Sequence, residues 1–278
     1  MFKHKRVASK RKRTVKTVAA VAGVAAAALV ATATAQAVVG GKPARTDKNS
    51  FMMLIKYGKT DFCAGVLAFD QIHVITSAEC IYSTEDNKDE TRVIAGRANA
   101  YTKKTGTPIR VKDVWIPDSF ADYSTDPSKA KVPNNDIAVL RLAKPMPSQY
   151  KPIKWVPSGF TYTPGTKARL LGWGTTSADQ EKSPGDLREA TLPLLPDSAC
   201  KRAYQGDYNP ENMICGGKPK GGVGACVNDR GAPLLVSDGK EWLLAGLTSW
   251  GEGCAEAGKP DVMTKVSKFA GELASATK

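Results

Sequence analysis

The sequence predicts an all-β fold that ends in a single helix. Short apolar or β-branched segments alternate with turn-forming residues along most of the chain. They lie at 51–57, 63–69, 74–77, 92–96, 109–114 and 137–142, and after a proline-containing link at 167–173, 189–194, 212–215, 233–238, 242–250 and 261–265. Helices are expected only at 196–204 and 264–274. A chain of 278 residues is long enough for two small packed units.

The N-terminus has the pattern of a secretion signal. Eight basic residues between Lys3 and Lys16 precede an apolar stretch at 18–30, and Ala35-Gln36-Ala37 fits a cleavage site. We therefore expect residues 1–37 to be removed as a signal peptide, leaving a secreted chain of residues 38–278 without a stable membrane anchor. Removing those eight basic residues lowers the net charge from +13 to about +5. No basic stripe remains that would indicate nucleic acid as a partner.

All six cysteines lie after residue 37, which is typical of a disulfide framework in an oxidising compartment. Spacing alone leaves about 15 ways to pair them. A metal centre is not expected, because the chain has no C-x₂-C pair and only two histidines, His4 and His73. We expect His73 to be a strand histidine. No metal and no cofactor are predicted.

Four motifs follow one another after residue 37. Residues 38–41 read V-V-G-G, 134–140 N-N-D-I-A-V-L, 171–174 L-G-W-G and 249–255 S-W-G-E-G-C-A. These motifs and their order resemble those of the trypsin-like serine protease family. The resemblance covers nearly all of the chain after residue 37. It implies two six-stranded antiparallel β-barrels, at about 51–145 and 158–262, followed by the helix at 264–274. It also implies three cystines, which are Cys63–Cys80, Cys200–Cys215 and Cys226–Cys254.

Two members of the family's catalytic triad are replaced. Residues 74–80 read V-I-T-S-A-E-C, with Glu79 where the family has histidine, and residues 226–233 read C-V-N-D-R-G-A-P, with Arg230 where it has serine. Asp136 matches the triad aspartate. Arginine has no nucleophilic lone pair, and a glutamate of ordinary pKa is a weak base near neutrality. The residues thus predict that the chain is not an enzyme, and that Glu79, Asp136 and Arg230 form a salt-bridged cluster.

The resemblance also implies an activated conformation. In the family, a freed branched N-terminus inserts and pairs with the aspartate before the nucleophile. Here these residues are Val38 and Asp229. Cleavage after Ala37 would expose Val38 directly and let the pair form on export. Cleavage after Ala35 would instead leave Gln36-Ala37 attached and block the insertion.

A specificity pocket can be kept after catalytic residues are lost, so we compare the residues here with those of the family's pocket. The acid at the pocket base is lost as Gly224, whereas a glycine of the opposite wall has become Asp261. Two interpretations stand: Asp261 keeps the preference for Lys or Arg, or it closes the pocket. Ser249, Trp250 and Gly251 form the cleft-lining strand. The oxyanion hole would use the backbone N–H groups of Asn228 and Arg230, and Asn228 replaces a glycine.

Two functions of different classes follow. The first is a secreted pseudoprotease that binds a protein, a peptide or a protease inhibitor, as a monomer. The alternative is an active secreted serine-type endopeptidase with unrecognised catalytic residues, or another chemistry run by Glu79 and Asp136, such as that of a two-carboxylate glycosidase. A vestigial product is the third interpretation. Cys80 and Cys226 fix the register of both altered motifs, which favours the first function.

Overall fold

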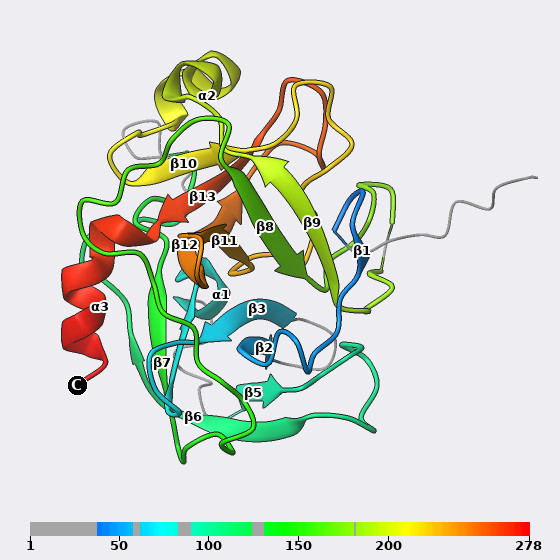
Figure 1. The fold of residues 1–278 in the computed structure, drawn as a ribbon, viewed down its shortest axis with the longest axis vertical. Helices are drawn as coiled ribbons and strands as arrows, with labels where there is room; N and C mark the ends of the chain where they lie inside the picture. Colours follow the sequence, from blue (N-terminus) through cyan, green and yellow to red (C-terminus); the bar gives the residue numbers. More distant parts are fainter. Residues whose placement is uncertain (1–37, 58–61, 83–89, 124–130, 181) are drawn as a thin grey trace, which may run out of the picture. The chain divides into compact units, whose positions relative to one another are not determined.

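The computed structural model describes residues 38–278 with the exception of 58–61, 83–89, 124–130 and 181. It confirms the predicted fold: two units of antiparallel strands and a C-terminal helix (Figure 1). The expected signal peptide lies outside the described residues. Within the described part of the chain, no helix is long and apolar enough to cross a membrane.

The first unit is a closed barrel of six strands in the order β2-β3-β4-β7-β6-β5. Each strand is paired antiparallel with its neighbours, and most of the strand residues are buried. The strands are β2 (Met52–Lys56), β3 (Phe62–Leu67), β4 (His73–Thr76), β5 (Arg92–Ala95), β6 (Thr107–Trp115) and β7 (Ala138–Leu142). His73 is buried on β4, where its Nδ1 lies 2.7 Å from Oδ2 of Asp70, as expected for a histidine of the strand framework.

The second unit is a seven-stranded sheet in the order β1-β9-β8-β11-β12-β13-β10. An isolated bridge between Leu194 and Gly216 joins the end of β9 to β10, so six of these strands form a ring. The strands are β1 (Lys42–Pro43), β8 (Lys167–Gly172), β9 (Arg188–Pro193), β10 (Met213–Gly216), β11 (Pro233–Ser237), β12 (Trp242–Trp250) and β13 (Asp261–Lys265). The sequence did not predict β1, which has only two residues and adds to the edge of β9.

The helices are short. They are α1 (Glu79–Tyr82), α2 (Asp197–Tyr204), η2 (Gln205–Asp207), η3 (Val266–Phe269) and α3 (Ala270–Ala276). One terminal helix was predicted at 264–274, whereas the structure has η3 from Val266 and then α3 from Ala270. The prediction starts too early because Thr264 and Lys265 continue β13 through pairs with β10 and β12. Phe269 and Leu273 anchor the helical end of the chain in the core.

Hydrogen bonds between described residues join the two units. The indole N–H of Trp173, which is fully buried after β8, donates to the carbonyl of Arg97 at 3.1 Å. The backbone N–H of Ala64 on β3 donates to the carbonyl of Arg230 at 2.9 Å. Residue 230 is therefore held by the first barrel although it belongs to the second unit.

Candidate functional site

Glu79 and Arg230 meet where the two units join. Glu79 opens α1 directly after β4, next to the Cys63–Cys80 disulfide, and Arg230 lies in the turn before β11. Nε of Arg230 lies 2.6 Å from Oε2 of Glu79. Burial raises the pKa of Glu79 to about 7, with the nearby Arg230 opposing the shift. The Arg230 side chain is 45% exposed, so the guanidinium also faces solvent.

Asp136 is held differently from the predicted three-member cluster. Its carboxylate is buried and accepts hydrogen bonds from the backbone N–H of Glu79 at 2.8 Å and from the hydroxyl of Ser249 at 2.5 Å. Among the described residues no salt bridge joins Asp136 to Arg230. Burial raises the pKa of Asp136. The predicted three-member cluster is therefore an ion pair of Glu79 and Arg230. Beside it lies the Asp136 carboxylate, which accepts hydrogen bonds from neutral donors.

Tyr123 completes this side of the site and was not among the site residues predicted from the sequence. The guanidinium carbon of Arg230 lies 5.8 Å from the centre of the Tyr123 ring, within cation–π range. Tyr123 comes from the loop between β6 and β7, part of which lies outside the described residues. No periodicity or motif marks such a loop contact.

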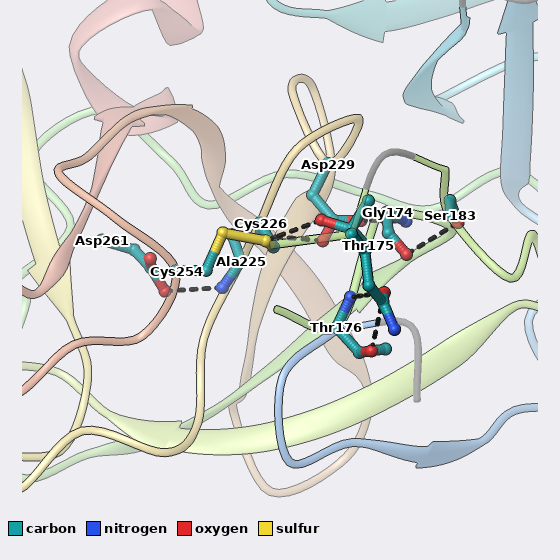
Figure 2. The surroundings of a disulfide bond; sticks show 10 residues. Gly174, Thr175, Thr176, Ser183, Ala225, Cys226, Asp229, Cys254 and Asp261 are labelled. Carbon is teal, nitrogen blue, oxygen red and sulfur yellow. Dashed lines mark hydrogen bonds between the residues drawn. A yellow bond between two sulfur atoms is a disulfide. The ribbon is translucent and has the colours of Figure 1, made fainter. Parts of the chain in front are cut away.

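A pocket of about 160 Å³ lies beside the ion pair. Its walls come from the loop before β11, the end of β12 and the start of β13. They comprise Tyr123, Ala225, Cys226, Val227, Asn228, Arg230, Thr248, Ser249, Trp250, Gly251, Gly253, Cys254 and Asp261. The Cys226–Cys254 disulfide ties two of these walls together (Figure 2). All three cystines pair as the resemblance implies.

Asp261 lines the wall of this pocket, and its carboxylate lies where a side chain at position 224 would otherwise stand. Oδ2 of Asp261 accepts a hydrogen bond from the backbone N–H of Ala225 at 2.8 Å (Figure 2), and a Cβ added to Gly224 would overlap that oxygen. The loss of a side chain at 224 and the gain of one at 261 are therefore sterically linked. Burial raises the pKa of Asp261 to about 7.

Asp229 directly precedes Arg230 in the turn before β11, and its side chain is fully buried. Its carboxylate accepts hydrogen bonds from the backbone N–H groups of Gly174 at 2.8 Å and Cys226 at 3.1 Å. Burial raises its pKa to about 7. A Cβ added to Gly172 would meet both Asp229 and a methyl group of Val38. Val38 is fully buried and thus shares the surroundings of Asp229.

The two expected oxyanion-hole donors line the pocket. Asn228 adopts the left-handed conformation with φ of 71°, so asparagine reproduces the backbone that the family's glycine permits. Among the described residues, neither the backbone N–H of Asn228 nor that of Arg230 has a hydrogen-bond acceptor.

The fold and this arrangement define a protein of the chymotrypsin-like peptidase class, and comparison with known proteins agrees. The family model described as Trypsin matches residues 38–271, and the chain belongs to this family. It is 34% identical to "Trypsin" of Saccharopolyspora erythraea over 84% of this chain and 94% of that protein. It is 33% identical to "Trypsin-1" of Astacus astacus (74% and 84%) and 32% identical to "Trypsin-like protease" of Streptomyces glaucescens (86% and 82%).

These relatives correct one sequence-based prediction. From Glu79 and Arg230 alone the chain was expected not to be an enzyme, whereas relatives at about 33% identity are named trypsins and a trypsin-like protease and point to a protease. The prediction was wrong because it equated the loss of one nucleophile and one base with the loss of all chemistry. The replacements at positions 79 and 230 change which groups can act as nucleophile and base.

Asp261→Asn tests the raised pKa of the buried Asp261 carboxyl in the pocket wall. Because the pKa of Asp261 is higher in the folded state than in the unfolded chain, this group stabilises the fold at low pH and loses that contribution as the pH rises towards 7. Between pH 5 and pH 8 the substitution should relieve about 2–3 kcal/mol of this loss. Urea unfolding of both proteins at the two pH values measures it. Parallel pH profiles would show that Asp261 titrates normally.

Proposed function

We propose that this chain is a secreted trypsin-family protein that binds an extended polypeptide in the pocket beside Arg230 and hydrolyses a peptide bond there. The single observation that carries the proposal is the pocket itself. Its acid is Asp261, and the backbone N–H groups of Asn228 and Arg230 have no acceptor among the described residues. Ser249 of its wall donates to the buried Asp136, and all of these residues stand on the scaffold that relatives named trypsin share. A protein inhibitor that presents an exposed loop is a ligand of the same kind.

A Lys or Arg side chain of the polypeptide would reach Asp261. The carboxylate lies at the pocket wall, its Oδ2 uses only one backbone donor, and a cation would supply the charge partner that it lacks among the described residues. Such a cation would also lower the pKa of Asp261 and keep it ionised near neutrality. This arrangement supports the interpretation in which the acid has moved across the pocket.

Hydrolysis at this site needs water as the nucleophile, because Arg230 has no lone pair to donate. Glu79, with its pKa raised to about 7, would take a proton from that water as it attacks the carbonyl carbon. The carbonyl oxygen would gain the negative charge beside the N–H groups of Asn228 and Arg230. Collapse of this tetrahedral intermediate breaks the C–N bond, and the proton held by Glu79 passes to the leaving amine.

The new N-terminus at Val38 would complete the site after export. Its α-ammonium group would pair with Asp229, which is buried with neutral donors only. We expect the chain that begins at Val38 to be about 1–3 kcal/mol more stable at pH 7 than one with a single added alanine. Thermal unfolding of both chains checks this. Asp229→Asn should remove the difference, and equal stability of the two parent chains would contradict the pairing.

The test of the proposed function is a cleavage assay on polypeptides with internal Lys and Arg residues. The chain that begins at Val38 is compared with its Glu79→Gln variant, prepared identically, and products are read by mass spectrometry. We expect products that end in Lys or Arg from the parent and none from the variant. Binding without cleavage by the parent would overturn the hydrolytic step, and failure to bind any polypeptide would overturn the proposal as a whole.

A further inference from the structure

The pocket has groups of opposite polarity on its walls. On one wall is Asp261, whose carboxylate has a single hydrogen-bond donor. Another wall carries the half-exposed guanidinium of Arg230 and the unpartnered backbone N–H groups of Asn228 and Arg230. All of these groups line the same 160 Å³ space. A ligand that satisfies them needs both a cation and an anion on one short framework.

Arg230 changes what this second wall can bind. A serine contributes a neutral hydroxyl, and an anion placed there would face the acids at positions 79 and 136 without compensation. Arg230 neutralises Glu79 through Nε, and its guanidinium has further N–H donors beyond that nitrogen. Asp136 is already satisfied by the Glu79 backbone and Ser249. The wall is therefore suited to an anion, and a guanidinium matches a carboxylate in shape.

We propose that the preferred ligand of this pocket is a polypeptide chain that ends in Lys or Arg with a free α-carboxylate. The carboxylate contacts the Arg230 guanidinium and the N–H groups of Asn228 and Arg230, and the basic side chain contacts Asp261. This inference rests on the proposed polypeptide binding and adds which part of the polypeptide is recognised. Hydrolysis after Lys or Arg yields such a chain end, so the product is retained.

The experiment is a calorimetric titration of the chain that begins at Val38 with three peptides of one sequence. They end in lysine with a free carboxylate, in lysine amide, and in norleucine with a free carboxylate. We expect the lysine acid to bind at least about tenfold more tightly than either of the others, because each of those loses one charge-assisted contact. The lysine amide changes the peptide and leaves the protein unaltered, so it tests the carboxylate contact without any effect on folding.

Variants assign the contact to Arg230. Since Arg230→Gln alone would leave Glu79 without its partner, the double variant Glu79→Gln with Arg230→Gln is used. It should lose most of the discrimination between acid and amide, because only the backbone N–H groups of residues 228 and 230 remain to contact the carboxylate. Arg202→Gln, which removes a cation of α2 outside this pocket, should keep the discrimination. Asp261→Asn should weaken the lysine acid and leave the norleucine acid unchanged.

Failure of this inference is distinguishable from failure of the proposed function. Equal binding of acid and amide by the parent, with both weakened by Asp261→Asn, would overturn the carboxylate contact and leave polypeptide binding standing. Discrimination that is undiminished in the double variant would overturn the role of Arg230. No binding of any of the three peptides, nor of one with an internal lysine, would overturn both.

Discussion

Replacing Glu79 by histidine and Arg230 by serine together is expected to create a serine-type hydrolase. The backbone of residue 79 already donates to Asp136, so an imidazole at this position would lie beside the carboxylate that orients it in this mechanism. A hydroxyl at position 230 would stand next to the unpartnered N–H groups of residues 228 and 230. The double variant should react stoichiometrically with a fluorophosphonate and cleave after Lys or Arg about 10³-fold faster than the parent.

The single variants Glu79→His and Arg230→Ser are the controls for this result. Each has only part of the nucleophile–base pair, and such groups act as a unit, so neither should be labelled at an appreciable rate. Circular dichroism and intact cystines show whether the double variant is folded. A folded double variant that fluorophosphonate does not label would contradict the arrangement of Asp136, residue 79 and residue 230 described above.

Gly231→Ala is expected to destabilise the protein by more than about 3 kcal/mol. Gly231 has φ of 72°, and an added Cβ would overlap the backbone oxygen of Ala64 and the hydroxyl of Thr76 on the first barrel. Relief requires the turn that holds Arg230 to move away from β3, which breaks the hydrogen bond between Ala64 and Arg230. Urea unfolding measures the loss.

Gly159 is the matched control for this substitution. Its φ of 77° is similar, but an added Cβ would meet no atom within 4 Å. Gly159→Ala should therefore cost only the backbone strain of about 1 kcal/mol. Equal costs at the two positions would show that the junction between the two units does not constrain residue 231.

Most of the fold could be predicted from the sequence, because strand-forming segments and family motifs both carry it. Strands β12 and β13 have the bounds predicted from the sequence. Short elements without a periodic signal were missed: β1 depends on its pairing with β9, and α1 is a single turn. The start of the terminal helix was misplaced because tertiary strand pairing of Lys265 outweighs local helix propensity.

The site could be predicted only where covalent or steric constraints fix it. Cys80 and Cys226 set the register of Glu79 and Arg230, and their ion pair follows from opposite charges in one place. The exchange between Gly224 and Asp261 follows from the overlap that a side chain at 224 would cause. The contact with Tyr123 and the hydrogen bond from Ser249 to Asp136 depend on side-chain directions that sequence spacing does not encode.

The error about enzymatic activity has a physical source as well. Residue types at two positions determine which nucleophile and base are present, and the sequence gives both without ambiguity. They do not determine whether Glu79, whose pKa is raised, can act as a general base toward a water molecule in the cleft. The family relationship weighs on the side of proteolysis.

The most direct test of the account is a mass-spectrometric incubation of the chain that begins at Val38 with a diverse peptide library, in which cleaved and retained peptides are read together. The account predicts that both sets are enriched in Lys or Arg at one position, and that Asp261→Asn abolishes the enrichment. A parent protein that neither retains nor cleaves peptides with a preference for a basic residue would contradict the claim that this pocket recognises a polypeptide through Asp261.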